Sequence, residues 1–368
     1  MKPVLFAAGV VPAYRVPGLA RLHELEGIEV ALFGGRSRHG GPVSEAELPL
    51  PSRRVGPAQL AALAASGRYR AVVCPTAGRL APLSAWAGAR RGGVPLILWA
   101  SLWAHPRSVA HAFTYLPLGR LYRSADAVVT YGPHVSRYVA SRGARNIQVA
   151  PQAVDNDFWR APCAGEPSVP GRPADERIRF LFVGRPAAEK GLDVLLDAWS
   201  AAAGRMAPAA LALVGVGVGF APEARARASG GTGGGEITCS DPLAPEQLRD
   251  VYAASDVLVL PSIATATFRE PWGLVVNEAM NRGLAVIASD AVGAVAGGLV
   301  KDGENGLVVP AGDAAALGAA IERLAGDGGL RAAMGVAGRR EVESYTYDAW
   351  ARGFSRALAT VGLARERW

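Results

Sequence analysis

The chain has 368 residues, half of them hydrophobic and 19% charged, with a formal net charge of +7. A single core stops growing at roughly 250–300 residues, so the length predicts two domains, and the composition excludes a largely disordered chain. The arginines are scattered and are not grouped with aromatic residues, which argues against nucleic-acid binding. A basic surface would still favour the approach to anionic lipid or to a phosphorylated substrate.

Cysteine content and the first residues bear on the compartment. The three cysteines are far apart and odd in number, which fits neither a disulfide framework nor a zinc site, so we expect a reducing compartment. Residues 1–8 could pass for the start of a signal peptide, but their apolar run is short, and a buried first strand is the preferred interpretation. No stretch reaches the ~18 apolar residues of a membrane span. These features predict a cytoplasmic protein, with the inner face of the membrane as an alternative location.

Short apolar runs alternate with segments of helical length in the first half of the chain. This alternation is typical of a parallel sheet covered by helices. The predicted strands, which have lengths suited to burial on both faces, are 4–8, 28–33, 71–74, 95–99, 127–131 and 147–150. The predicted helices are 57–66, 80–91, 108–124 and 133–142.

A second alternation follows a break in the pattern. Residues 161–176 hold four prolines and two glycines and are predicted to be a domain linker. The segment 226–235, rich in Ala, Gly and Ser, is predicted to be a surface loop, and 345–363 an amphipathic helix that must pack on another element. The remaining predicted strands are 179–183, 210–214, 236–238, 257–260 and 285–289, and the remaining helices are 191–203, 245–254, 273–282, 313–325 and 329–343. Two similar α/β halves would form a cleft, faced by the carboxyl ends of their strands.

Two carboxylates, Glu270 and Glu278, stand eight residues apart around a turn that contains Pro271 and Gly273. If this turn opens a helix, the backbone amides at its N-terminus favour a diphosphate, while Glu270 meets sugar hydroxyls and Glu278 a ribose. The alternative is an ordinary helix with one Glu at its N-terminal end and the other on a solvated face.

A basic loop follows the first strand of the second half. Residues 184–191 place Arg185 and Lys190, one of only three lysines in the chain, between a strand and a helix. Cations at this position would neutralise a leaving diphosphate. Taken alone, such a loop is more often an ordinary turn between a strand and a helix, with solvated charges. The glycines of 214–219 could suggest dinucleotide binding, but the signal is weak, because that fingerprint is Gly-x-Gly-x-x-Gly on the first strand with an acid about 20 residues on.

These segments together resemble the donor domain of retaining, family 4 ("group 1") glycosyltransferases of the GT-B fold. The resemblance spans residues 180–345 and is specific for fold and reaction type rather than for substrate. It implies an α/β protein of two Rossmann-like parallel-sheet domains facing an interdomain cleft. The implied domains are 1–165 on the acceptor side, 175–345 for the nucleotide-sugar donor, and a C-terminal helix, 346–368, packed back on the first. The matching motifs are Gly184-Arg185…Lys190-Gly191, Glu270-Pro271-Trp272-Gly273…Asn277-Glu278-Ala279-Met280…Gly283, 286–290 and 302–310.

The resemblance also implies roles for individual residues. Arg185 and Lys190 would bind the diphosphate, Glu270 would contact the sugar near its anomeric carbon, and Glu278 would hold the ribose. Since these cations do the neutralising, no metal and no other cofactor are implied, in line with the lack of an Asp-x-Asp motif. The expected donor-binding residues are Arg185, Lys190, Glu270, Trp272, Gly273, Leu274, Val275 and Glu278.

The first half resembles the family more loosely. A Gly-Gly pair often found after the first strand is missing, and Tyr14 and Arg15 are candidates for contact with the acceptor there. Many relatives have a histidine near the reacting carbon in a loop comparable to the one that holds His105, so His105 is a catalytic candidate together with Glu270, Arg185 and Lys190. His134 is a further acceptor-side candidate. An ordinary loop histidine is the alternative in both cases.

The predicted function is metal-independent transfer of a hexose, with retention, from a nucleotide diphosphate sugar to a hydroxyl. A UDP-sugar is the favoured donor and a GDP-sugar the alternative. The acceptor is expected to be a small molecule, a lipid-linked molecule or a glycan, and peripheral contact with a membrane is an option. Competing hypotheses are another GT-B activity, such as a nucleotide-sugar epimerase or a sugar-phosphate-accepting synthase, and a non-catalytic nucleotide-sugar-binding protein.

Overall fold

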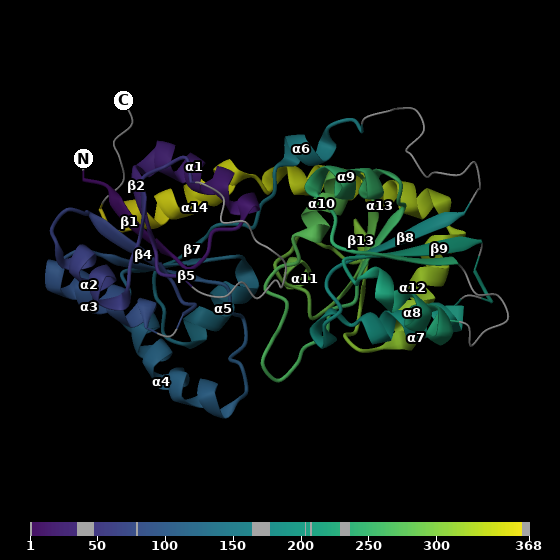
Figure 1. Ribbon diagram of the computed structural model, residues 1–368, viewed down its shortest axis with the longest axis horizontal. Coiled ribbons are helices and arrows are strands. Elements are labelled where there is room, and N and C mark those ends of the chain that lie inside the picture. Colours follow the sequence, from purple (N-terminus) through teal and green to yellow (C-terminus); the bar gives the residue numbers. More distant parts are fainter. Residues whose placement is uncertain are drawn as a thin grey trace. The chain divides into compact units, whose positions relative to one another are not determined.

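The computed structural model describes residues 2–34, 48–78, 80–163, 177–202, 204–206, 208–228 and 236–362. The chain divides into two compact units. Unit 1 comprises Met1–Asp155 together with Tyr345–Trp368, and unit 2 comprises Asn156–Ser344. Each unit has its own parallel sheet (Figure 1). The predicted linker lies outside the described residues from residue 164 onward.

Unit 1 is built on a seven-stranded sheet of order β3-β2-β1-β4-β5-β6-β7, in which every neighbouring pair is parallel. Apolar residues dominate its central strands, which are buried on both faces, as helix-covered parallel sheets require. The strands are β1 (Val4–Ala8), β2 (Ile28–Leu32), β3 (Ser52–Arg54), β4 (Ala71–Pro75), β5 (Leu96–Ala100), β6 (Ala127–Thr130) and β7 (Ile147–Val149).

Helices cover both faces of this sheet. Alternate residues of β1 separate the two cores, because Val4 and Phe6 join one cluster while Leu5 and Ala7 join the other. Figure 1 shows α1 (Val16–Glu26) and α14 (Tyr347–Thr360) on one side of the sheet. On the other side lie α2 (Pro57–Ala65), α3 (Ala81–Gly92), α4 (Val109–Ser124) and α5 (Pro133–Ser141), and a short 3-10 turn, Ala13–Arg15, precedes α1.

The last helix, α14, belongs to unit 1 although unit 2 precedes it in the chain. Its apolar stripe is buried: Trp350, Phe354 and Leu358 pack in the core that β1 and α1 share. Phe6 meets Phe354 edge to face, with ring centroids 5.6 Å apart. The amphipathic pattern of 345–363 therefore marked a real helix.

Unit 2 has a six-stranded parallel sheet of order β10-β9-β8-β11-β12-β13. The strands are β8 (Ile178–Val183), β9 (Ala209–Val214), β10 (Glu236–Ser240), β11 (Val257–Leu260), β12 (Ala285–Ser289) and β13 (Gly306–Val309). The helices are α6 (Asn156–Arg160), α7 (Leu192–Ala202), α8 (Ala221–Ala228), α9 (Pro245–Ala253), α10 (Val275–Asn281), α11 (Gly293–Ala296), α12 (Ala314–Gly326) and α13 (Gly328–Glu341), with 3-10 turns at Ala188–Lys190, Val218–Phe220 and Val342–Ser344.

The strand order of unit 2 indicates at which edge of the sheet a ligand would bind. The chain fills one side of β8 with β9 and β10 and then crosses to the other side to form β11. In doubly wound sheets, ligands bind at the carboxyl ends of the strands where the order reverses. In unit 2 this point lies between β8 and β11, whose following loops hold Lys190 and Glu270 respectively.

The predicted α/β class with two parallel sheets is confirmed, and all eleven predicted strands exist with small shifts at their ends. Two strands were missed: β3, whose three residues are polar and exposed, and β13. Four helices, α1, α6, α8 and α11, were also missed. The predicted surface loop 226–235 is wrong in its first residues, because α8 continues to Ala228; the rest of that segment lies outside the described residues.

Candidate functional site

The loop after β8 is held against the segment after β11 by backbone contacts. The Ile263 amide donates to the Glu189 carbonyl at 3.0 Å. Gly191 has φ +66°, and a Cβ built on it would lie 2.0 Å from the Pro261 carbonyl oxygen. Only glycine fits this left-handed, close-packed position. The loop is thereby fixed with Lys190 facing β11.

Lys190 and Glu270 form an ion pair, with Nζ 2.5 Å from Oε2. Their side chains are only 12% and 6% exposed, so the charges interact with little screening from solvent. Ser262, two residues beyond β11, donates its hydroxyl to the same Glu270 oxygen at 3.3 Å. An ammonium, a carboxylate and a hydroxyl thus meet at the carboxyl ends of β8 and β11.

The turn that carries Glu270 is packed tightly from behind. Glu270 pairs its backbone with Val292, and the Ala294 amide donates to the Trp272 carbonyl at 2.8 Å. Gly273 adopts φ +92°, and a Cβ there would lie 2.7 Å from a methyl group of Leu260. This packing permits only one backbone conformation of the turn, which fixes the direction in which the Glu270 side chain leaves it.

Helix α10 begins two residues later than the predicted helix 273–282, with Val275 as its first residue and Leu274 preceding it. Asn277 is fully buried and accepts the indole N–H of Trp272 at 2.8 Å. Its carbonyl oxygen accepts from Asn281, which also donates to Asn156. These bonds join the turn, α10 and α6 into one polar network inside unit 2.

Glu278 has a different partner from Glu270. The hydroxyl of Tyr252, on α9, donates to Glu278 Oε2 at 2.8 Å. Burial raises the pKa of the Glu278 carboxyl to about 7, and the Tyr252 bond opposes this shift. Burial and the neighbouring carboxylate likewise raise the pKa of Tyr252 well above its ordinary value. Glu278 is therefore a carboxyl group poised to titrate near neutral pH.

Arg185 is ion-paired with Glu189 within the same loop, one turn away in sequence. Its side chain is more exposed than that of Lys190. A pair within one loop whose guanidinium is partly exposed contributes little to stability, so the guanidinium is available to an incoming anion at small cost.

The candidates of unit 1 are mostly enclosed by their own surroundings. One ring nitrogen of His105 lies 2.8 Å from the His111 carbonyl oxygen and the other 3.3 Å from the Tyr138 hydroxyl. Arg15 is buried, donates to Gln152 at 2.6 Å, and lies 5.3 Å from the Trp350 ring centroid.

Of the other two candidates, His134 is buried and meets Trp103 edge to face at 5.3 Å. Tyr14 is exposed, and its carbonyl oxygen accepts from the Tyr347 hydroxyl.

The structure thus brings Lys190 and Glu270 into direct contact and gives Arg185 and Glu278 separate partners. Sequence reasoning missed Ser262, Tyr252 and Glu189 as those partners. Ser262 carried a usable signal, because it follows a buried strand at the ligand-binding edge. Within the described ranges, no three His, Cys, Asp or Glu side chains gather as a metal site requires. Nor does any described helix combine the length and apolar character needed to cross a bilayer.

Part of the chain is similar in sequence to known glycosyltransferases. Residues 177–327 match the family model described as glycosyl transferases group 1. A D-inositol 3-phosphate glycosyltransferase of Rhodococcus jostii is 35% identical over 127 residues, which are 34% of this chain and 26% of that protein. The chain thus spans about a quarter of the length of the curated relatives it matches.

Solved structures match nearly the whole chain. The crystal structure of Anabaena HepE in complex with UDP and glucose covers 98% of this chain and 100% of its own, with a TM-score of 0.72 and 17% identity. Sucrose-phosphate synthase from Thermosynechococcus elongatus covers 98% and 99%, with a TM-score of 0.72 and 21% identity. The predicted fold class, two Rossmann-like domains of the GT-B type, is confirmed by this likeness and by the two doubly wound sheets.

Proposed function

We propose that the protein is a retaining, metal-independent glycosyltransferase that moves a hexose from a nucleotide diphosphate sugar, preferably a UDP-sugar, to a hydroxyl of an acceptor. The observation that carries this proposal is the Lys190–Glu270 pair at the carboxyl ends of β8 and β11. It is supported by the group 1 glycosyltransferase match across 177–327 and by neighbours solved with UDP and glucose.

In this proposal, the cations of the loop 184–191 neutralise the negative charge of the leaving diphosphate. When the bond between the anomeric carbon and the diphosphate breaks, negative charge grows on the leaving group, and groups that bind it more tightly at that moment lower the barrier. Lys190 and Arg185 supply that charge. Both are paired with carboxylates, so an arriving diphosphate exchanges one anionic partner for another rather than meeting an unpaired cation.

The same exchange gives Glu270 its role. Once the diphosphate has taken over Lys190, the Glu270 carboxylate is available to accept hydrogen bonds from sugar hydroxyls near the anomeric carbon. Ser262 and the tight turn at Gly273 keep it oriented. The backbone of Trp272, Gly273, Leu274 and Val275 completes the donor contacts.

Glu278 is assigned to the ribose of the nucleotide. An ionised carboxylate can accept from both ribose hydroxyls, and its present partner, Tyr252, contributes the hydrogen bond that already favours the ionised form. The two carboxylates have separate tasks, so the paired-carboxylate scheme of glycosidases is not part of the proposal. For retention we favour attack from the face that the diphosphate leaves, with a donor phosphate oxygen assisting deprotonation of the acceptor.

Unit 1 would provide the acceptor side. His105 is assigned a position near the reacting carbon, and Tyr14, Arg15 and His134 form the acceptor-side set. If the ring of His105 donates from the nitrogen nearest the His111 carbonyl, its other nitrogen is left as a hydrogen-bond acceptor. The acceptor is specified only by class, as a hydroxyl on a small molecule, a lipid-linked molecule or a glycan, and the reaction is placed in the cytoplasm.

The test is UDP release from UDP-glucose, with EDTA present and without any acceptor, followed by analysis of the sugar product. Slow release of UDP together with free glucose supports a transferase that uses water as a poor acceptor. Conversion of the sugar to an epimer indicates the epimerase. Binding of UDP-glucose without any turnover indicates a non-catalytic protein.

A further inference from the structure

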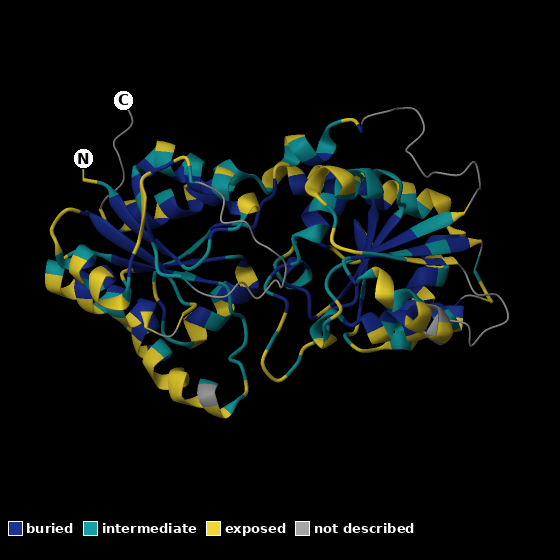
Figure 2. Cartoon of the chain, in the orientation of Figure 1, coloured by how far each residue is buried: buried dark blue, intermediate teal, exposed yellow. Residues whose placement is uncertain are grey.

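One face of α4 carries a stripe of exposed apolar and basic side chains, which a helix that only packs on a sheet does not need. Val109, Phe113, Leu116, Arg120 and Arg123 recur at spacings of three and four residues, which places them on one face. The first three are 79%, 77% and 74% exposed, and both arginines are exposed as well. The face therefore has an apolar N-terminal half and a basic C-terminal half, with most of the helix open to solvent (Figure 2).

The apolar half of this stripe does not contribute to the core of unit 1. Packing of α4 depends on Leu121 and Tyr122 near its C-terminal end, which join the core cluster beneath the sheet. Isolated exposed apolar residues are common, but a group of large ones on one helix face marks an interaction surface. The exposed side chains of α4 thus remain to be explained by a partner.

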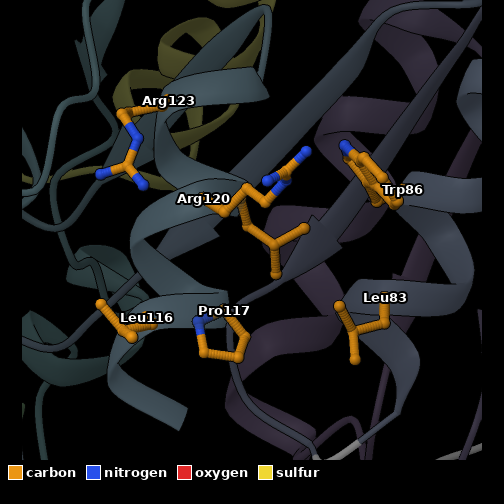
Figure 3. A pocket seen from close by; sticks show the side chains of 7 residues that line it. Leu83, Trp86, Leu116, Pro117, Arg120 and Arg123 are labelled. Atoms are coloured by element: carbon orange, nitrogen blue, oxygen red, sulfur yellow. The ribbon is translucent and has the colours of Figure 1, made fainter.

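Helix α3 extends the apolar area next to α4. Its residues Leu83 and Trp86 lie across a hollow of about 340 Å³ from Leu116, Pro117 and Arg120 (Figure 3). Leu80, just before α3, is also exposed. We define the α3–α4 surface by its exposed apolar and basic side chains, which are Leu80, Leu83, Arg90, Arg91, Arg107, Val109, Phe113, Leu116, Arg120 and Arg123.

The charge of this surface has a single sign. Residues 80–125 contain five arginines and no Asp or Glu. Counted along the sequence, unit 1 has 22 Lys and Arg against 9 Asp and Glu, a formal charge of +13, whereas unit 2 has 17 against 23, a charge of −6. The modest net charge of the whole chain therefore conceals a strongly basic unit. Such a field attracts an extended anionic partner.

We propose that the α3–α4 surface docks on an anionic lipid bilayer, with Val109, Phe113 and Leu116 inserted among the lipids and the arginines on the headgroups. Interfacial helices bind in this way, through buried apolar area combined with attraction to anionic lipid. The inference is independent of the proposed reaction, because it rests on residues that have no role in donor binding.

Two other occupants fit the surface less well. A soluble polyanion would satisfy the arginines but would leave three large apolar side chains in water. A second copy of the chain would cover those side chains but would set one basic surface against an identical one, and like charges at close range repel. A lipid surface satisfies both halves of the stripe.

The experiment is co-sedimentation of the full chain with vesicles of phosphatidylcholine alone or of phosphatidylcholine mixed with phosphatidylglycerol. We expect binding to the mixed vesicles only, reduced by high salt. Phe113→Ser with Leu116→Ser should lower the partition coefficient by about tenfold or more, since two large side chains lose their burial. Arg120→Ser with Arg123→Ser should lower it by about thirtyfold, from the loss of two charges at the headgroups.

Matched controls lie on α13 of unit 2, where Val336 is 74% exposed and Arg340 is exposed. Val336→Ser and Arg340→Ser should leave vesicle binding unchanged. Absence of wild-type binding to the mixed vesicles at low salt would overturn the proposal. Vesicle binding by the Phe113→Ser, Leu116→Ser variant that equals wild-type binding would also overturn the proposal, and would point to a soluble polyanion as the occupant. A wild-type dimer that these two substitutions convert to monomers, without a change in sedimentation with lipid, would overturn it as well and would point to a second copy of the chain.

Discussion

Lys190 and Glu270 are 80 residues apart in sequence, yet their charged atoms lie 2.5 Å from each other. The contact exists because β8 and β11 are neighbours in the sheet, so that the loops following them share one edge. The pair holds a cation and an anion in a nearly buried position, each oriented by the other. We interpret this as a site prepared for a ligand that carries negative charge at one end and hydroxyls at the other.

Substitution of Glu270 tests how much its carboxylate, as the partner of Lys190, contributes to the stability of the protein. Glu270→Ala leaves a nearly buried ammonium without this partner and is expected to lower the free energy of unfolding by about 3 kcal/mol. Glu270→Gln retains an oxygen for Lys190 and Ser262 and should cost clearly less. Urea unfolding of the two variants measures the difference, and a loss of less than about 1 kcal/mol for Glu270→Ala would show that the charge pair contributes little to the stability of the loop.

The Gly191 position tests whether close packing fixes the Lys190 loop. Gly191→Ala introduces a Cβ 2.0 Å from the Pro261 carbonyl oxygen in addition to left-handed strain. Gly303→Ala is the matched control, since its φ is +74° and no atom lies within 4 Å of its added Cβ. We expect a loss of about 1 kcal/mol for the control and about 3 kcal/mol or more at Gly191. Similar melting temperatures for the two variants would argue against the tight contact.

Titration of Glu278 should appear in the pH dependence of stability. Its pKa in the folded protein is raised to about 7 from an ordinary value of 4.5. A raised carboxyl pKa means that the folded state favours the protonated form, so the wild type loses stability as pH rises from about 4.5 through 7. Glu278→Gln removes this loss, and the variant should gain on the order of 2 kcal/mol relative to wild type between pH 5 and pH 8. Parallel pH profiles from chemical denaturation would contradict the shift.

His105 allows a separation of chemistry from nucleotide binding. If it acts near the reacting carbon, His105→Ala should lower UDP release from UDP-glucose about a hundredfold while leaving UDP affinity unchanged, because the proposed nucleotide contacts all belong to unit 2. His111→Ala is the control for local damage, since the His111 carbonyl oxygen, in the first turn of α4, lies 2.8 Å from the His105 ring. Equal effects of both substitutions on release would assign His105 a structural role only.

Much of the fold followed from local patterns in the sequence. Buried parallel strands are continuous apolar runs, and for this reason β1, β11 and β12 were predicted with their exact ends. The strand β3 has no apolar residue, and nothing local identifies it. Helix α1 was missed because Pro17 and Gly18 suggest a loop, whereas in the structure Gly18 leaves room for the Trp350 ring.

The individual residues of the site could be predicted from the sequence, but the pairs that they form could not. Residue types and their order indicated that Lys190, Glu270 and Glu278 were candidates, but the pairing of Lys190 with Glu270 depends on strand order across the sheet. Tyr252 carried no distinctive signal, because a tyrosine on the buried face of an amphipathic helix is usually packing. The basic character of unit 1 was hidden by the acidic character of unit 2 in the total charge.

Nucleotide binding by wild type, Lys190→Ala and Lys301→Ala, measured by calorimetry with UDP and with GDP in the presence of EDTA, tests the account most directly. Lys301 is the matched control, because it is also a lysine of unit 2 in an ion pair, but an exposed one with Glu341. The account predicts that wild type and Lys301→Ala bind UDP without metal, and that Lys190→Ala binds at least about tenfold more weakly through loss of a charge-assisted contact. Undiminished UDP binding by Lys190→Ala, or no binding of either nucleotide by wild type, would contradict the assignment of this site to a nucleotide diphosphate.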